Sequence, residues 1–360
     1  MIVLQTIKGQ AFLYMQSKNK AKISICIPTY NRADLLAQTL QSVANQTIKP
    51  YEVIVVDNNS TDGTLKVCKH YQKKYGIKFI VNKKNIGMIG NWNKAISLAK
   101  GDYICLLHSD DLIAPDWHAT WIKTISKHKA AFYTSAITII DDKNAPLFTA
   151  HIFNHDRYMK QPETMKLFLQ QLAPMIAPSG ASIYQKKVFR EIGLYDPAYK
   201  TEADVPHFLK LVSRYDVFYR DKIVFAWRTH EAQTFDKAKT VKSVEGELIR
   251  LDNYFKIIAG YYQSFYKNNL EWKIFVQTHM FMALSAINLH LIKGKLKKVV
   301  GSHRLARRHF PTALTTTSDW MRFINIQFKL VIRALTLSFI NKRDKNSLSW
   351  LKDINIPKKL

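Results

Sequence analysis

The chain has 360 residues, of which 47% are hydrophobic and 12% aromatic, which is enough apolar material for a packed core and excludes global disorder. Its 54 Lys and Arg against 27 Asp and Glu give a formal charge of +27, which attracts polyanions such as sugar nucleotides, nucleic acids or anionic lipids without choosing among them. The cysteines are widely spaced and form no CxxC pair, which argues against a zinc motif and predicts reduced packing residues at Cys26, Cys68 and Cys105.

Strand-like and helical stretches alternate through the first 140 residues. Continuous apolar runs predict strands at residues 23–28, 52–57, 77–81, 103–108 and 131–140. Apolar residues at helical spacing predict helices at residues 34–46, 65–75, 88–100 and 115–128, the third of them ending at Gly101. This alternation predicts right-handed crossovers, and therefore an α/β fold with a mostly parallel central sheet flanked by helices.

The pattern is looser from residue 149 onward, where we expect helices at 163–172 and 204–212 and a strand at 223–227. From about residue 236 the sequence has a helical pattern, no strand signature, and far more Lys and Arg than Asp and Glu. The first residues lack the pattern of a secretory signal, and we find no uninterrupted apolar run of membrane-spanning length. The chain is therefore divided into an N-terminal extension (1–20), an α/β domain (21–235) and a helical, strongly basic C-terminal region (236–360).

Polar clusters follow three of the predicted strands. They are Thr29–Arg32, Asp57–Ser60 and Ser109–Asp111. In parallel sheets, ligands bind outside the carboxyl ends of the strands, where these clusters should converge. The sequence thus predicts a binding site at one edge of the sheet.

The adjacent carboxylates of Asp110 and Asp111 are the strongest local feature. Holding two of them together is costly unless a cation neutralises them, and Mg²⁺ or Mn²⁺ prefers such oxygens together with substrate phosphates. The alternative is an Asp that caps the helix opened near Pro115, with a solvated neighbour. Asp57, at the end of its strand, either accepts a hydrogen bond from a nucleotide base or forms a tight turn.

An ordered set of motifs makes the chain resemble the family 2 glycosyltransferases. The motifs are IPTYNR (27–32), VVDNNSTDGT (55–64), NIG (85–87), AKGDYICLLHSDD (99–111), PSGASIYQKKVFREIGLYD (178–196), ADVPHFLKL (203–211) and WRTH (227–230). Each motif alone is weak, whereas the set, which spans residues 22–233, is specific. The resemblance implies a GT-A, Rossmann-like fold and an enzyme that moves a sugar from a nucleoside diphosphate, with inversion at the anomeric carbon.

The resemblance also implies roles for individual residues. Asp57 would hydrogen-bond the base, while Asn85 and Gly87 would shape a loop beside the nucleotide, although Asn-x-Gly is also an ordinary turn. Asp111 would ligate Mg²⁺ or Mn²⁺, and Asp110 would face the ribose or the metal. The nucleotide cleft would be lined by Pro28, Thr29, Tyr30, Asn31 and Arg32.

The expected catalytic base lies where the chain departs from the family pattern. Relatives usually carry Glu-Asp just before a helix, whereas this chain has Ala203 at the position of that Glu. Alignment on the following helix makes Asp204 the base that deprotonates the acceptor hydroxyl. Glu202 either replaces the missing acid or is itself the base, and Asp204 also fits a carboxylate favoured by the helix dipole.

The last motif carries Arg228 and His230. In the family this element lies near the diphosphate or the metal, so we expect Arg228 to contact phosphate and His230 to join the metal ligands; the alternative is a solvated loop. Trp92 lies where many relatives carry a basic residue. It either stacks on the base or packs, and packing is favoured.

The basic C-terminal region predicts association with an anionic membrane. Basic clusters occur at 293–298 and 304–308, and residues 321–340 interleave apolar and basic side chains. The alternative is a cationic face that packs on the catalytic domain or forms a homo-oligomer. We expect a cytoplasmic enzyme, peripheral on the inner face of the plasma membrane, that uses a UDP-linked donor and a saccharide or lipid-linked saccharide acceptor in bacterial surface-polysaccharide synthesis.

Three other functions were weighed. A sugar-nucleotidyltransferase needs an early glycine-rich loop, and the stretch after Ile27 has no glycine cluster. A nucleic-acid-binding module needs a recognised motif or stacking platforms in a basic patch, and the charge lies outside the motif region, so no nucleic-acid partner is expected. A catalytically weak homologue that acts as a scaffold subunit of a polysaccharide assembly complex is kept as the alternative because of Ala203.

Overall fold

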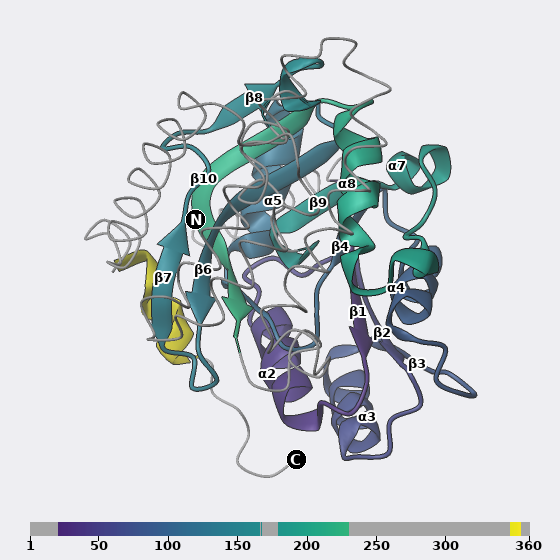
Figure 1. The fold of residues 1–360 in the computed structure, drawn as a ribbon. Coiled ribbons are helices and arrows are strands. Elements are labelled where there is room, and N and C mark those ends of the chain that lie inside the picture. The colour runs from purple at the N-terminus through teal and green to yellow at the C-terminus, as the bar shows by residue number, and fades with distance from the viewer. Residues whose placement is uncertain (1–20, 166, 168–178, 230–345, 354–360) are drawn as a thin grey trace, which may run out of the picture.

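The computed structural model describes residues 21–165, 167, 179–229 and 346–353 of the chain (Figure 1). The first half of the domain alternates strands and helices, as expected. Its elements are β1 (Ile23–Thr29), α2 (Ala33–Ala44), β2 (Glu52–Asp57), α3 (Thr64–Tyr75), β3 (Lys78–Val81), α4 (Met88–Ser97), β4 (Tyr103–Leu106), β5 (Leu112–Ile113), α5 (Trp117–Lys127) and β6 (Phe132–Ile140).

The second half has shorter and less regular elements before one long strand. They are β7 (Pro146–Ala150), β8 (Arg157–Met159), the 3₁₀ turn η1 (Ser179–Ala181), β9 (Ser182–Gln185), α7 (Lys186–Glu191), the 3₁₀ segment η2 (Pro197–Glu202), α8 (Asp204–Val212) and β10 (Val217–Arg228). A further 3₁₀ segment is η4 (Asn346–Asp353).

The strands form one ten-stranded sheet with the order β3-β2-β1-β4-β9-β6-β10-β5, to which β7 and β8 add at β6 and β10. Strands β3, β2, β1 and β4 are mutually parallel. All seven residues of β1 and all nine of β6 are buried, because helices and other strands cover these strands on both faces. The three cysteines are free and buried, as predicted.

The α/β class is confirmed, but the sheet is mixed rather than mostly parallel. Strand β9 runs antiparallel to both β4 and β6, and the pairs β6–β7, β5–β10 and β8–β10 are also antiparallel. The sequence showed no sign of β9, because it is only four residues long and lies directly between a 3₁₀ turn and a helix. Its insertion ends the parallel half of the sheet.

Helix α4 ends earlier than predicted. It stops at Ser97, and Gly101 is not its cap. A side chain at Gly101 would place a Cβ 2.5 Å from the Lys22 carbonyl oxygen and 2.6 Å from Ser24 Oγ. Glycine is therefore required there for the close approach of two backbone segments rather than for helix termination.

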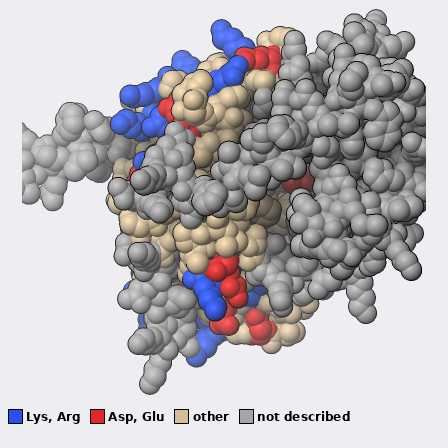
Figure 2. Space-filling view, turned by 60° about the vertical axis from the view of Figure 1, so that its left-hand side comes forward, with Lys and Arg blue, Asp and Glu red and all other residues tan. Residues whose placement is uncertain are grey.

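The long C-terminal region lies outside the described residues, apart from η4, in which Leu348, Trp350 and Leu351 are buried. The predicted helices at 236–345, most of the predicted helix at 163–172, and the boundary near residue 235 therefore lie outside as well. Among the helices that the structure describes, none has the length and apolarity to cross a bilayer. On the face shown in Figure 2, basic and acidic side chains of the described residues lie in small mixed groups around an uncharged area.

Candidate active site

The three predicted polar clusters meet at one edge of the sheet. Strand β1 lies between β2 and β4, and the three strands are parallel, so their carboxyl ends are neighbours. Residues 28–32 end and follow β1, Asp57 ends β2, and the Asp110–Asp111 pair follows β4. The predicted convergence of the three clusters is therefore confirmed, at the edge where parallel sheets bind ligands.

Asp110 has a cationic partner within the site. The guanidinium of Arg32, which follows β1, forms an ion pair with Asp110 Oδ2. The side chain of Arg32 is 23% exposed and that of Asp110 is 9% exposed. Two of the predicted donor-site residues are therefore in direct contact, and the charge of Asp110 is compensated from within the chain.

Asp111 lies deeper and is only half satisfied. Its Oδ1 accepts a hydrogen bond of 3.0 Å from the backbone N–H of Arg228, whereas its buried Oδ2 has no hydrogen-bond partner among the described residues. Burial, and then the charge of Asp110, raise the pKa of the Asp111 carboxyl well above its ordinary value. A buried carboxylate oxygen without a donor fits a position where a cation binds.

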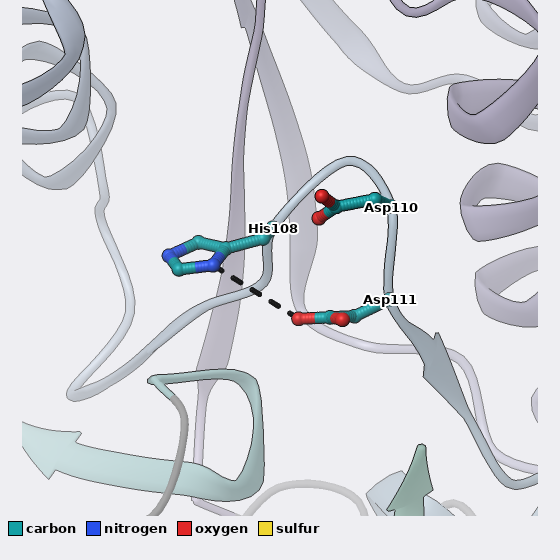
Figure 3. A group of neighbouring side chains, drawn as sticks. All are labelled: His108, Asp110 and Asp111. Carbon is teal, nitrogen blue, oxygen red and sulfur yellow. Dashed lines mark ion pairs between the residues drawn. The ribbon is translucent and has the colours of Figure 1, made fainter. Parts of the chain in front are cut away.

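His108 faces the unsatisfied oxygen. Its Nδ1 lies 3.9 Å from Asp111 Oδ2, and both Asp110 and Asp111 direct their carboxylates to the side on which His108 lies (Figure 3). Burial lowers the pKa of His108, which favours the neutral imidazole that ligates metals. One ligand atom from each of these three residues lies within 4.8 Å of the others. His108, which stands in the predicted motif, was not selected as a ligand from the sequence.

The side chain of Arg228, which was expected to contact phosphate, points into the protein interior. The residue is completely buried, and its guanidinium donates to the carbonyl of Asp110 at 2.7 Å and to Gln38 Oε1 at 3.0 Å. It also donates to the carbonyls of Asp141 and Asp142. Arg228 therefore fixes the loop that carries the carboxylate pair.

Asp57 is also engaged by its own loop. Its carboxylate accepts hydrogen bonds from the backbone N–H of Ser60, at 3.1 Å for Oδ2, and from the Ser60 hydroxyl. Ser60 Oγ in turn accepts from the backbone N–H of Asn31, and Asn31 Oδ1 accepts from the N–H of Thr61. Asn31 has a positive φ of 48°, which an asparagine tolerates better than most residues. The loops after β1 and β2 thus hold each other in place.

A buried asparagine network holds the loop before α4, and sequence reasoning missed it. Asn58 donates to Asn85 Oδ1 at 2.8 Å and to the Gly87 carbonyl at 3.2 Å, while Asn82 donates to Asn58 Oδ1 at 3.0 Å. Asn91 donates to the Val56 carbonyl and accepts from Asn82. Gly87 has φ 80°, which favours glycine. The predicted residues Asn85 and Gly87 therefore shape this loop from within.

Aromatic side chains connect the carboxylate loop with helix α8. Trp92 stacks on His108, with ring centroids 4.9 Å apart, and meets Tyr195 edge-on at 5.5 Å. Tyr195 packs against His207 of α8 at 4.3 Å. Trp92 packs against other side chains, as predicted. Its partner is His108 of the carboxylate loop, a contact that the sequence around Trp92 did not indicate.

Asp204 is the first residue of α8 and is partly exposed. Burial, and to a lesser extent the charge of Asp204, raise the pKa of Tyr195 to about 12. Ala203 is completely buried, so a glutamate in its place would have a desolvated carboxylate. Glu202 ends η2, and its side chain is outside the described part of the chain, as is the predicted metal ligand His230.

Pro28 and Thr29 are buried at the end of β1, and Tyr30 is 44% exposed. Thr29 Oγ1 is buried and has no hydrogen-bond partner within the described residues. The edge therefore offers an exposed ring beside a buried hydroxyl. Together with the arginine, carboxylates and imidazole described above, it offers groups for a polar, anionic ligand and a divalent cation.

Comparison with known proteins finds similarity to glycosyltransferases. The sequence profile of glycosyl transferase family 2 matches residues 24–193. An uncharacterized glycosyltransferase of Rickettsia typhi is 25% identical over 332 residues, which are 92% of this chain and 96% of that protein. The uncharacterized glycosyltransferase YwdF of Bacillus subtilis is 30% identical over 54% of this chain and 70% of its own length. Poly(ribitol-phosphate) beta-glucosyltransferase of Bacillus spizizenii is 36% identical over 35% of this chain but only 20% of its own length.

Solved structures show the same fold. S. aureus TarS 1–349 superposes with a TM-score of 0.50 at 17% identity, covering 81% of this chain and 91% of that one. The same protein in complex with UDP-GlcNAc also gives a TM-score of 0.50, over 82% of this chain and 93% of the other.

Proposed function

Because the chain belongs to glycosyltransferase family 2, we propose that it transfers a sugar from a UDP-linked donor to a hydroxyl group of a saccharide or lipid-linked saccharide. The fold is of the GT-A type expected from the sequence. The single observation that carries the proposal is the buried Oδ2 of Asp111, which accepts no hydrogen bond from the described residues and lies near the Arg32–Asp110 ion pair at the carboxyl edge of the parallel strands.

The donor is proposed to lie across the ends of β1, β2 and β4. The UDP-GlcNAc complex of TarS supports a nucleoside-diphosphate sugar, and the loops after β1 and β2 supply the matching groups. Tyr30 offers an exposed ring, and the guanidinium of Arg32 can turn from Asp110 to a phosphate, since both accept the same bidentate hydrogen bonds. Asp57, buried and fixed by Ser60, shapes the floor on which the base would rest.

Asp111 and Asp110 would hold a divalent cation, Mg²⁺ or Mn²⁺, with His230 as a further proposed ligand. Such a cation neutralises charge on a diphosphate leaving group. The residues fit this role because Asp111 Oδ2 lacks a hydrogen-bond donor among the described residues, and because the backbone N–H of Arg228 binds the other oxygen, Oδ1.

The transfer is proposed to invert the anomeric carbon by direct displacement. The carboxylate of Asp204 or Glu202 accepts the proton of the acceptor hydroxyl. At the same time the hydroxyl oxygen bonds to the anomeric carbon, and the bond between that carbon and the diphosphate breaks. Asp204 is favoured because it begins α8, is partly exposed, and lies on the same helix as His207, which packs against Tyr195. The helix N-terminus stabilises its ionised form.

The acceptor is proposed to belong to a bacterial surface polysaccharide, reached at the inner face of the membrane. The name of the poly(ribitol-phosphate) beta-glucosyltransferase supports an acceptor of this class, and the net charge of +27 supports attraction to anionic lipid. Flotation with anionic liposomes tests the surface binding, which salt should weaken. Sedimentation of the same preparation would show whether the chain forms a homo-oligomer.

Calorimetry with UDP, GDP, CDP and dTDP, each with and without Mn²⁺, tests the donor site. We expect one nucleotide, UDP, to bind only with the cation, and Asp111→Ala to abolish that binding. If none of the four binds in the presence of Mn²⁺, the proposal is wrong. The alternative, a weakly catalytic scaffold subunit, is suggested by Ala203 in place of the usual acid; it predicts nucleotide binding without turnover of any UDP-sugar and acceptor pair.

A further inference from the structure

Two buried polar atoms without partners lie on facing residues of one loop. Asp111 Oδ2 and His108 Nε2 are both buried and make no hydrogen bond within the described part of the chain. The other imidazole nitrogen, Nδ1, points at Asp111 Oδ2 across 3.9 Å, which exceeds a hydrogen bond (Figure 3). A buried carboxylate oxygen without a donor, faced by an imidazole nitrogen beyond hydrogen-bond distance, fits a position where a cation is bound between the two atoms.

The spacing suits a shared cation. Two atoms that each bind one metal at about 2.1 Å cannot be more than about 4.2 Å apart, and the Nδ1–Oδ2 distance of 3.9 Å lies inside that limit. With Asp110 included, one ligand atom from each of the three residues lies within 4.8 Å of the others. Asp110 already has Arg32 as its counter-ion, whereas Asp111 Oδ2 accepts no hydrogen bond from the described residues.

The chain orients both groups before any ligand arrives. A backbone hydrogen bond of 3.2 Å from the Asp111 N–H to the His108 carbonyl closes the turn, which places the two side chains on one side. The Arg228 N–H holds Asp111 Oδ1, leaving Oδ2 for the imidazole side. Stacking on Trp92 at 4.9 Å fixes the plane of the His108 ring.

We propose that His108 is a ligand of the bound cation, through Nδ1, and that it makes the site prefer Mn²⁺ and other transition metals to Mg²⁺. Imidazole nitrogen suits transition metals, whereas Mg²⁺ takes oxygen ligands almost exclusively. Trp92 acts as a positioning residue that holds the ring for this contact. The inference rests on the proposed donor site and specifies which cation that site selects.

Electron spin echo spectroscopy of the Mn²⁺–UDP complex of the full chain tests the ligand directly, because it detects ¹⁴N bound to the metal. His108→Asn and His230→Asn are measured side by side, since both histidines are nitrogen candidates, and His155→Asn, an exposed histidine away from the site, is the matched control. We expect the nitrogen modulation to weaken in His108→Asn and to be unchanged in His155→Asn.

Metal titrations give the second readout. We expect His108→Asn to weaken Mn²⁺ and Co²⁺ binding by at least about tenfold, the lower range reported even for residues that only support a ligand. The affinity for Mg²⁺ should change less, and His108→Asp should shift the preference toward Mg²⁺. Trp92→Leu should reduce the Mn²⁺ affinity in the same direction but less.

The outcomes separate this inference from the donor-site proposal. If Mn²⁺ binding needs Asp111 but neither the nitrogen signal nor the metal preference responds to His108→Asn, the inference is overturned and the donor site stands. If Mn²⁺ and UDP fail to bind the wild-type chain, or bind equally in Asp111→Ala, the donor-site proposal itself fails. A reduced nitrogen signal together with a lowered Mn²⁺-to-Mg²⁺ affinity ratio supports the inference.

Discussion

Arg228 is the buried cation that fixes the loop of the carboxylate pair, and replacing it tests that role. Its guanidinium donates to the carbonyls of Asp110, Asp141 and Asp142 and to Gln38 Oε1 at 2.7–3.3 Å. Arg228→Met keeps an apolar stem but leaves these four oxygens without their donor. Only the bond to the Asp110 carbonyl is buried and the other three are partly buried, so at about 0.5–1 kcal/mol for each hydrogen bond the loss of unfolding free energy is about 2–4 kcal/mol, against ~3–5 kcal/mol for breaking a fully buried ion pair.

Arg228→Lys separates charge from geometry. A single ammonium group keeps the charge but cannot reach all four oxygens, so we expect a loss of about 1–3 kcal/mol. Urea unfolding followed by circular dichroism gives the free energies, and calorimetry gives the affinity for UDP with Mn²⁺. Arg190→Met, an exposed arginine on α7, is the matched control and should stay within about 0.5 kcal/mol of wild type.

The loop-fixing role also predicts function. A loosened Asp110–Asp111 loop should weaken cation-dependent UDP binding in Arg228→Met, even at temperatures where the variant is folded. If Arg228→Met unfolds at the wild-type urea concentration, the energetic reasoning is wrong. If it is destabilised but binds UDP and Mn²⁺ unchanged, Arg228 stabilises the fold without holding the site.

Three further variants test other parts of the structure. Asp204→Asn should lower kcat by about 10²–10⁴-fold with UDP affinity retained; Glu202→Gln is its comparison, and full turnover in both variants would exclude either acid as the base. Gly180→Ala should lower the unfolding free energy by about 1–3 kcal/mol, because its Cβ would lie 2.4 Å from the Phe225 ring. Gly63→Ala is the control, because its Cβ meets its nearest neighbour at 3.4 Å. Equal melting temperatures of the two variants would contradict the prediction. Burial lowers the pKa of His207 to about 3, so below about pH 6.5 the unfolded chain takes up a proton that the folded chain excludes. The unfolding free energy of the wild type should therefore fall toward pH 3 by up to about 1.4 kcal/mol per pH unit. His207→Phe removes this group and should make the unfolding free energy less dependent on pH in that range. Equal slopes of unfolding free energy between pH 4.5 and 7 in both proteins would refute that account.

The sequence determined the parts of the fold that depend on local pattern. Strand β2 and helix α8 begin and end at the predicted residues, because β-branched runs and helical spacing are properties of neighbouring positions. Once β1, β2 and β4 were expected to be parallel, their polar ends had to meet at one edge. The location of the candidate site follows from that strand order, whereas the family resemblance rests on the ordered set of sequence motifs.

Only the tertiary structure decided what each site residue contacts. Arg228 and Asp111 are 117 positions apart in the chain, yet the backbone of one holds the carboxylate of the other. The insertion of β9 between β4 and β6, the burial of the Arg228 guanidinium and the stacking of Trp92 on His108 likewise depend on contacts between distant segments. Hydrophobic periodicity reports which side of an element is buried but not which partner covers it, so an arginine suited to phosphate could not be distinguished from one that binds carbonyl groups inside the protein.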